Sequence, residues 1–381
     1  MLKDEGHNPA VVFLDLSAAF DTVNHQILLK KYQLSGIGEE ALILLNSYLS
    51  DRRQFTEVNG VSSEEVRVSM GTPQGSCLST LNYTVYVNDI ARLTTSGRLR
   101  MFADDKAMIY DDYDEEVIQA DMTLVAEYFR INKLTVNFNK SKIVVFGSRS
   151  HAVSALSFNG TEIEAVSDIK YLGLNIDQGL TWRTHINELC SSISSAIGIL
   201  YKVRSFFPSS ALKMAYNSLV QSKMLYMIQI YGTATKTLLN RVFVLQKRAL
   251  KLIHGVNLRH STVDLFSNVA KNQLPLGALI TRSIALHVHK LITNQSFHNL
   301  QLPRVPNDIS TRSSVRGSLK VRRSRTSRHG DACMRSIGPK IYNELPRNVI
   351  EIISIPGFKR ATTNYLQQPD CLAKAISLSR P

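Results

Sequence analysis

Two adjacent carboxylates, Asp104 and Asp105, lie among mostly apolar residues in the segment MFADDKAM. A third acid, Asp15, ends the apolar run AVVFLD, which is typical of a buried strand. If the two segments are neighbours in one sheet, the three carboxylates converge on an oxygen-rich site suited to Mg²⁺. Such a site can support phosphoryl transfer by two metal ions. Adjacent acids at a turn are also common as simple solvated groups, so the pair alone does not decide the chemistry.

The elements that must position these acids follow from local patterns. The segment RLRMFADDKAMIY, residues 98–110, predicts a hairpin with ADDK at its tip. The pair Asn59-Gly60 predicts a second hairpin, because both residues tolerate the positive φ angles of a tight turn. This part of the chain is therefore of mixed α and β type. Helices are predicted over residues 22–34 with Asp21 as N-cap, over 39–49, and over 114–130 with Val117, Leu124, Val125 and Tyr128 on one face.

The sequence changes character after about residue 180, where helical periodicity replaces strand patterns. The first helix carries an apolar stripe of Ile186, Leu189, Ile193, Ile197 and Leu200. A later helix, with a stripe of Leu238, Val242, Leu245, Ala249 and Leu252, ends before Gly255, a suitable C′ residue. Four basic residues of this later helix are expected away from the stripe, namely Arg241, Lys247, Arg248 and Lys251.

The charge of the chain is unevenly distributed. Residues 1–150 contain 15 Lys and Arg against 20 Asp and Glu, whereas the remaining 231 residues contain 30 against 11. A basic second part suggests a surface that binds a polyanion, and residues 303–335 are expected to be a basic surface segment. No run approaches the roughly 18 apolar residues of a membrane span, and no cysteine pair has zinc-ligand spacing. We therefore expect a soluble protein without a membrane partner.

Five motifs occur in order: FLDLSAAFDTV, GTPQGSCLSTLNYTVYVNDI, FADD, LTVNFNKSK and YLGLNID. Between residues 10 and 180 this series resembles the palm of reverse transcriptases, and in particular the polymerase of non-LTR retrotransposons of the jockey and CR1 kind. The later segment SIGPKIYNELPRNVIEI is similar to the C-terminal region of such retrotransposon proteins. The resemblance implies an RNA-directed DNA polymerase that takes an RNA template, a DNA primer and dNTPs.

The same resemblance implies roles for individual residues. Asp15, Asp104 and Asp105 are implied as catalytic ligands of two Mg²⁺ or Mn²⁺ ions, together with the main-chain carbonyl of Leu16. Phe20 is implied beneath the sugar of the incoming nucleotide, Gln74 and Gly75 beside its base, and Lys140 near the pyrophosphate, with Lys142 as an alternative. The segment Tyr171, Leu172 and Gly173 is implied to hold the primer end, and the basic residues Arg241, Lys247, Arg248 and Lys251 to bind the duplex.

We predict an α+β fold with an antiparallel sheet and packed helices: a palm over residues 1–180, a helical thumb over 181–255 and a basic C-terminal region over 256–381. Only 14 residues precede Asp15, so we expect the fingers region and the endonuclease of the family to be absent. The alternatives are a catalytically silent remnant that binds RNA or DNA, and a group II intron-type maturase. We expect an intracellular location, in the nucleus or in a cytoplasmic ribonucleoprotein.

Overall fold

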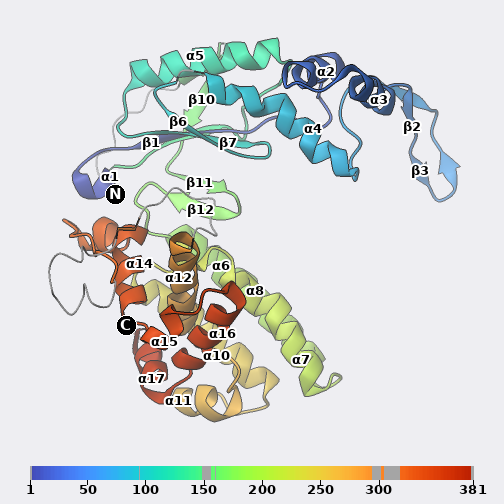
Figure 1. The fold of residues 1–381 in the computed structure, drawn as a ribbon. Helices are drawn as coiled ribbons and strands as arrows, with labels where there is room; N and C mark the ends of the chain where they lie inside the picture. Colours follow the sequence, from blue (N-terminus) through green and yellow to red (C-terminus); the bar gives the residue numbers. More distant parts are fainter. Residues whose placement is uncertain are drawn as a thin grey trace. The chain divides into compact units, whose positions relative to one another are not determined.

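The computed structural model describes residues 2–93, 95–147, 156–158, 160–293, 302–303 and 318–378. The chain divides into two compact units (Figure 1). The N-terminal unit comprises His7–Leu172 together with Leu2, and the C-terminal unit comprises Gly173–Pro381 together with Lys3–Gly6. This division after Leu172 lies near the predicted palm boundary at residue 180, which stays a prediction. Each unit has its own hydrophobic core.

The N-terminal unit is built on a six-stranded sheet with the strand order β6-β7-β1-β8-β10-β9. Strand β1 lies in the interior and pairs antiparallel with β7 and β8, while β8 and β10 are parallel. A central strand is covered on both faces, which explains the continuous apolar sequence of β1. The strands are β1 (Ala10–Leu14), β6 (Arg98–Phe102), β7 (Asp105–Tyr110), β8 (Lys142–Val145), β9 (Leu156–Phe158) and β10 (Thr161–Ala165).

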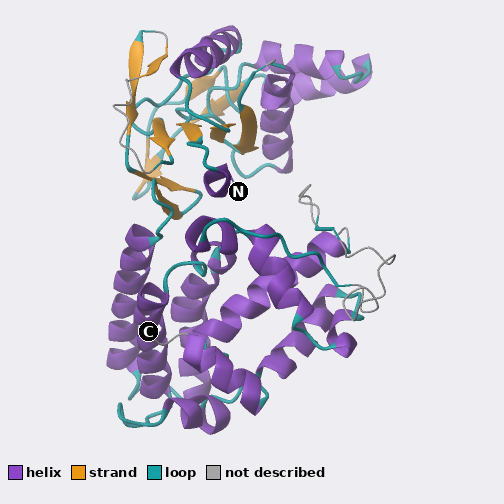
Figure 2. Ribbon diagram, turned by 90° about the vertical axis from the view of Figure 1, so that its left-hand side faces the viewer, coloured by secondary structure: helices purple, strands orange, loops and turns teal. Residues whose placement is uncertain are grey.

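Helices of the N-terminal unit pack against this sheet (Figure 2). The longest, α5 (Glu115–Ile131), is capped by Asp114, whose side chain accepts a hydrogen bond from Val117 N. Its predicted span is confirmed, but the predicted apolar face is partly wrong, because Val117 and Leu124 are exposed. The buried face is Ile118, Met122, Val125, Ala126 and Phe129. The other helices are α2 (His25–Leu34), α3 (Glu39–Leu49), α4 (Cys77–Val87) and η1 (Asn88–Arg92).

Two predictions about turns have opposite outcomes. The hairpin at Asn59-Gly60 is confirmed, since β3 (Glu57–Val58) pairs with β4 (Val61–Ser62) and both turn residues have positive φ. These strands lie between β2 (Arg52–Gln54) and β5 (Val66–Val68), which pair with each other. The prediction of Asp21 as N-cap is wrong. Helix α2 begins later, and Asn24 caps it by accepting a hydrogen bond from Ile27 N.

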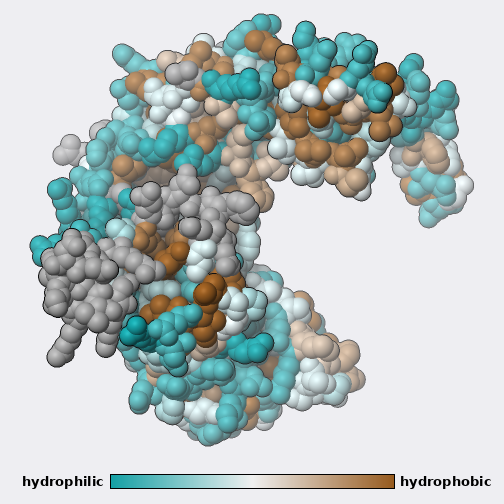
Figure 3. Space-filling view, viewed as in Figure 1, coloured by the Kyte–Doolittle hydropathy of each residue, from teal (hydrophilic) through white to brown (hydrophobic). Residues whose placement is uncertain are grey.

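Four large apolar side chains on α2, α3 and α4 are exposed: Leu34, Ile43, Leu44 and Leu81. Hydrophobic surface over these helices is visible in Figure 3. Single exposed apolar residues are ordinary, whereas a cluster marks an interaction surface. The helical layer of the N-terminal unit therefore exposes several large apolar side chains.

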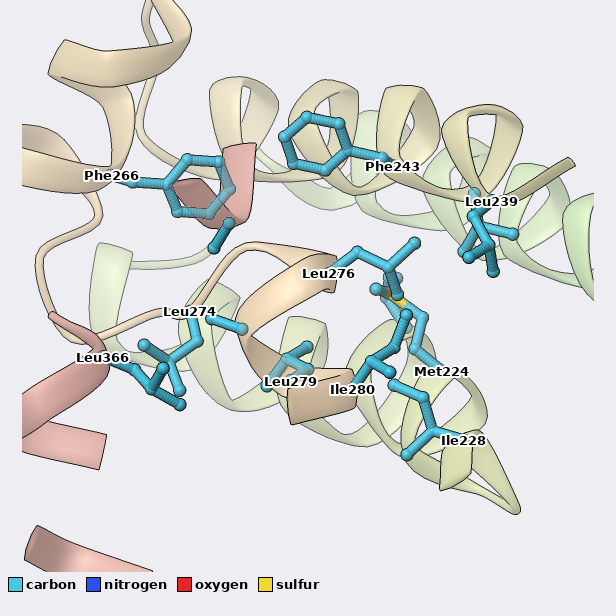
Figure 4. Packing of buried hydrophobic residues seen from close by; sticks show 14 of the residues in the cluster. Met224, Ile228, Leu239, Phe243, Phe266, Leu274, Leu276, Leu279, Ile280 and Leu366 are labelled. Carbon is cyan, nitrogen blue, oxygen red and sulfur yellow. The ribbon is translucent and has the colours of Figure 1, made fainter. Parts of the chain in front are cut away.

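The C-terminal unit is helical, and one core unites its elements. Figure 4 shows side chains from α8, α9, α10, α12 and α16 packed in this cluster. Helix α12 and the later helices complete the core of α6 and α10, so the predicted thumb and C-terminal region share one core, and their division at residue 255 stays a prediction. The elements are α1 (Leu2–Glu5), β12 (Leu174–Asp177), α6 (Arg183–Val203), α7 (Ser209–Tyr216), η2 (Asn217–Gln221), α8 (Ser222–Leu225), α9 (Ile228–Tyr231), α10 (Lys236–Ile253), α11 (Thr262–Asp264), η3 (Leu265–Val269), α12 (Leu276–Ile292), η4 (Ser327–Asp331), α14 (Met334–Asn343), α15 (Arg347–Ile350), α16 (Ile355–Leu366) and α17 (Pro369–Leu378).

The basic segment predicted over residues 303–335 is described only in part, and residues 304–317 lie outside the described residues. The portion around residue 325 is tied to the start of the chain. The backbone N–H groups of Arg325 and Thr326 donate to Asp4 Oδ1 over 2.9 and 2.7 Å, and Leu319 is buried. None of the helices among the described residues combines the length and apolar character needed to cross a membrane.

Candidate active site

The register of the sheet brings the three acids together. Strands β1 and β7 pair Leu14 with Lys106, so the next step of this antiparallel ladder places Asp15 beside Asp105. Asp104 lies in the turn between β6 and β7, where Ala103 has a φ of 52°. The predicted hairpin is confirmed with a shorter turn, since Asp105 and Lys106 belong to β7. The strands that carry the acids are neighbours, while their convergence on one metal site stays a prediction.

The electrostatics of the site reflect that proximity. Burial raises the pKa of Asp105, and the negative charges of Asp104 and Asp15 raise it further, while Lys106 and Lys140 oppose the rise. Like charges at short range disfavour ionisation, so a cluster of this kind favours bound cations. The three acids are therefore close enough to interact, and the net effect of burial and of the surrounding charges is a raised pKa of Asp105.

Lys106 is a feature of the site that the sequence reasoning missed. Its side chain is fully buried, and its Nζ donates to Tyr83 Oη over 3.3 Å and to the Asp104 carbonyl over 3.2 Å. Burial lowers its pKa to about 8, although the three carboxylates act in the opposite direction. A signal was present, because residues 106, 108 and 110 share one face of a strand, and Met108 and Tyr110 are apolar.

Asp15 is held in place through hydrogen bonds of its backbone. Its N–H donates to Ser141 Oγ over 3.1 Å, and its carbonyl accepts from Asn137 N over 2.9 Å. The exposed Lys140 places Nζ 3.6 Å from Asp15 Oδ2. Leu16 forms an isolated antiparallel bridge with Val136 through hydrogen bonds of the flanking residues. In such a pair the carbonyl of Leu16 points away from the partner segment, which leaves it available as a ligand.

The acidic site offers oxygen ligands only. Three carboxylates and a carbonyl are the hard oxygen ligands that Mg²⁺ prefers. Within the described residues, no group of three or more His, Cys, Asp and Glu side chains is arranged closely enough to hold a metal ion. Mg²⁺ commonly takes only one or two protein carboxylates and completes its shell with water and substrate phosphates. The ligand types therefore fit Mg²⁺, whereas the three carboxylates do not by themselves form a complete metal site among the described residues.

Two of the motifs are joined by hydrogen bonds. The N–H of Gly71 donates to the Val23 carbonyl over 2.8 Å, and the N–H of Thr72 donates to the Phe20 carbonyl over 2.9 Å. Gln74 Nε2 donates to Asp21 Oδ1 over 2.9 Å. This is the role that the structure gives to Asp21 in place of a helix cap. The loop after β1 and the GTPQGS turn therefore form one rigid substructure.

The ring of Phe20 completes this substructure. It stacks on Tyr83 at 4.6 Å between ring centroids with an interplanar angle of 29°. Phe20 is half-buried, so it has a packed face and an open one. A cavity of about 650 Å³ adjoins the turn and is lined by Asp21, Arg52, Arg67, Gly71 and Gln74, among others. The two arginines were not singled out from the sequence, since they belong to the short strands β2 and β5, which carry no recognisable motif.

The hairpin at YLGL is present as two short strands, β11 (Asp168–Tyr171) and β12. Leu172 and Gly173 form its turn with φ angles of 47° and 74°. The ring of Tyr171 contacts Phe13 at 4.8 Å. Burial raises the pKa of Tyr171, and the negative charge of Asp105 adds to this effect. Tyr171 is thus close enough to the acidic site for the charge of Asp105 to affect its pKa.

The basic residues of α10 do not all face solvent. Arg241 and Arg248 are exposed, and Arg241 Nη1 donates to Asn187 Oδ1 over 2.6 Å. Lys247 Nζ lies 4.7 Å from the centre of the Phe243 ring. The expectation that Lys251 lies away from the buried face is wrong.

Lys251 is 8% exposed, and its ammonium donates to the carbonyls of Leu258 and His260 over 2.6 and 2.7 Å. An amine engaged in this way stabilises a loop and is not available to phosphates. Trp182 is also buried, and its Nε1 donates to Thr233 Oγ1 over 3.2 Å.

The chain is similar in sequence to known proteins over the residues that form this site. Residues 1–176 match the family model "Reverse transcriptase (RNA-dependent DNA polymerase)", and domains of this family are generally metal-dependent. The RNA-directed DNA polymerase from the mobile element jockey of Drosophila melanogaster is 26% identical over 269 residues, covering 66% of this chain and 29% of the relative. The probable RNA-directed DNA polymerase from transposon BS of the same organism is 30% identical over 258 residues, covering 64% and 28%.

A third relative extends the similarity into the C-terminal unit. The probable RNA-directed DNA polymerase from the transposon X-element of Drosophila melanogaster is 27% identical over 336 residues, covering 82% of this chain and 36% of the relative. The chain thus spans between 28% and 36% of the length of these three relatives. Among solved structures, apo telomerase from Candida tropicalis matches with a TM-score of 0.36 and 13% identity, covering 65% of this chain and 42% of that one. On the sequence matches, residues 1–176 of this chain belong to the reverse transcriptase family, in the form carried by non-LTR retrotransposons.

Proposed function

We propose that the chain acts as an RNA-directed DNA polymerase of a non-LTR retrotransposon, with Asp15, Asp104 and Asp105 as its catalytic centre. The observation that supports this proposal most strongly is the register of β1 and β7, which sets an acid from one motif beside the acids of another. An isolated acidic pair at a hairpin tip would have no such partner. The reaction class follows from the family of residues 1–176.

In the proposed reaction the oxygen of a primer 3′-hydroxyl attacks the α-phosphorus of a dNTP. The bond from that phosphorus to the pyrophosphate breaks, and the hydroxyl proton leaves to solvent. Two Mg²⁺ ions, or Mn²⁺ in their place, would activate the attacking oxygen and stabilise the leaving oxygen. Asp15, Asp104, Asp105 and the carbonyl of Leu16 are the ligands that we propose. Lys140 places its cation near Asp15, where it would offset charge that develops on the pyrophosphate.

The nucleotide would lie over the substructure that joins the two motifs. Phe20 has an open face and is fixed from behind by Tyr83, so a bulky ring there would exclude a 2′-hydroxyl and favour dNTPs. Gln74 and Gly75 belong to the turn beside this ring and are proposed to contact the incoming base. Because Gln74 is held by Asp21, its amide is already oriented before the nucleotide binds.

The template and primer would be bound by both units. In the hairpin, Tyr171, Leu172 and Gly173 are proposed to contact the primer end. On α10, Arg241, Lys247 and Arg248 are proposed to neutralise phosphates without reading sequence, which predicts a salt-sensitive affinity. Substrates of this kind favour a location in the nucleus or in a cytoplasmic ribonucleoprotein.

Primer extension on an RNA template tests the proposal. The wild type and Asp104→Asn are compared with Glu116→Gln, a matched control on the exposed first turn of α5. We expect divalent-ion-dependent extension by the wild type and by Glu116→Gln, and a loss of at least about 100-fold for Asp104→Asn, since a metal ligand contributes several kcal/mol. Absence of extension by the wild type, with RNA binding retained, would leave only a silent nucleic-acid-binding role.

A further inference from the structure

The C-terminal unit contains a cavity of about 870 Å³, and of its lining residues only Arg248 has a role in the function proposed above. It lies between the last turns of α6 and α10 and the loop that follows α10. Its volume falls within the range of about 300–1,000 Å³ that is typical of ligand sites. The residues that matter for its chemistry are Gly198, Tyr201, Lys202, Arg204, Arg248 and Leu258.

The lining combines positive charge with an exposed aromatic ring. None of the described residues that line the cavity is acidic. Three of the lining residues are basic and have exposed side chains. The Tyr201 side chain is 59% exposed. The guanidinium carbon of Arg204 lies 4.4 Å from the centre of the Tyr201 ring, so the arginine orients one face of the ring by a cation–π contact.

One wall of the cavity is fixed by the buried Lys251. Its ammonium holds the carbonyls of Leu258 and His260, and its own carbonyl accepts from Val256 N over 3.0 Å. Gly255, with a φ of +66°, turns the chain from α10 into this wall. The loop is therefore pre-organised, which reduces the entropic cost of binding a ligand against it.

We propose that this cavity binds an unpaired nucleotide of single-stranded RNA or DNA, with the base stacked on Tyr201 and the phosphates beside Lys202, Arg204 and Arg248. An aromatic platform flanked by cations is the arrangement by which proteins hold single strands without reading sequence. A duplex cannot use it, because its base faces are stacked internally. This inference rests on the proposed function, since it assigns one segment of the template or primer to a site away from the acidic centre.

Gly198 allows a sharp test, because a Cβ built at this position meets no atom within 4 Å and the residue lines the cavity. Gly198→Gln and Gly198→Glu have nearly the same shape and differ in charge, and Gly198→Ala controls for the effect on the helix. Fluorescence anisotropy would measure binding of oligo(U), oligo(dT) and an abasic deoxyribose-phosphate strand by the full chain. Thermal melting of each variant would verify the fold.

For oligo(U) and oligo(dT) we expect Gly198→Glu to bind about 10-fold more weakly than Gly198→Gln at low salt, and Tyr201→Ala to lose about 10-fold. The abasic strand should respond to the charge but not to Tyr201→Ala. The RNA and DNA arms identify which strand the cavity prefers. Equal binding by Gly198→Glu and Gly198→Gln, or an equal loss for the abasic strand on Tyr201→Ala, would overturn the proposal and favour a protein ligand.

The outcome is separable from that of the polymerase proposal. Asp104→Asn should retain single-strand binding while losing primer extension. Gly198→Glu should retain extension at saturating primer-template while losing single-strand affinity. If the wild type neither extends a primer nor binds single strands, both proposals fail. If the wild type extends a primer and the cavity variants have no effect on single-strand binding, only the proposal of a single-strand site fails.

Discussion

Lys106→Met is the substitution whose effect can be worked out most fully from the structure. Methionine has a similar length and keeps the apolar contacts with Tyr83 and Phe129, whose ring centres lie 5.9 and 6.0 Å from the ammonium. The variant removes a fully buried charge beneath the acidic site. Replacement of a buried ionic group by a well-packed apolar one is often neutral or stabilising. We therefore expect a more stable N-terminal unit at neutral pH.

The magnitude follows from the pKa of the amine. The pKa of Lys106 falls from 10.5 to about 8 on folding, and each pKa unit corresponds to about 1.4 kcal/mol. Keeping the ammonium charged in the folded chain thus costs about 3 kcal/mol at about pH 7. Between the folded and unfolded pKa values the unfolded chain binds more protons, so the free energy of unfolding rises with pH. The wild type should therefore gain about 2 to 3 kcal/mol relative to Lys106→Met between about pH 7 and pH 10.

Pulse proteolysis in urea, with fragments of the N-terminal unit quantified in the presence of a chelator, would measure this difference. Titrations of other groups cancel between wild type and variant, and the loss of the hydrogen bond to Tyr83 adds an offset that is the same at both pH values. A stability difference that does not change with pH would refute the reasoning, since it would mean that Lys106 titrates normally in the folded chain.

Two further predictions concern backbone positions and a buried amine. Gly71→Ala should destabilise the N-terminal unit by more than about 3 kcal/mol, because at a φ of +86° the new Cβ would lie 2.7 Å from the backbone oxygen of Asp21. Gly75→Ala has the same φ but no atom within 4 Å of the new Cβ, so it should cost only about 1 kcal/mol. Chemical denaturation compares the two variants, and equal losses of stability would contradict the packing argument. Lys251→Met should leave two loop carbonyls without their donor and cost about 2 to 4 kcal/mol of stability. Hydrogen exchange should then show lower protection of residues 256–260. Unchanged exchange of these residues would show that the amine does not hold the loop.

The acidic site could be predicted because its parts are encoded locally. A continuous apolar run identified β1, and alternation on both sides of the turn identified the β6–β7 hairpin, so Asp15 and Asp104 could be assigned to strand ends. Their proximity required only that the two strands be neighbours. The alternation also placed Lys106 on the same face as Met108, but its burial was missed because a lysine in a strand pattern is ordinarily expected on the solvent face.

The wrong predictions concern features that depend on competing local hydrogen bonds or on contacts with residues distant in the sequence. Asp21 and Asn24 are both good N-cap residues, and the turn in which Asp21 N donates to the Ala18 carbonyl delays the start of α2. Lys251 was placed on the open face because its two carbonyl acceptors belong to a loop whose course the sequence does not specify. Contacts of this kind also join the predicted thumb to the predicted C-terminal region, since α10 and α12 share one core that the sequence does not specify.

Binding of Mn²⁺ measured by electron paramagnetic resonance, with primer-template and dNTP present, tests most directly whether acids from separate motifs share divalent ions. We predict that Asp15→Asn and Asp104→Asn each weaken Mn²⁺ binding by at least about 10-fold, while Glu116→Gln leaves it unchanged. If Asp15→Asn binds Mn²⁺ as the wild type does, Asp15 and the β6–β7 turn do not form one metal site, and the account of the catalytic centre is wrong.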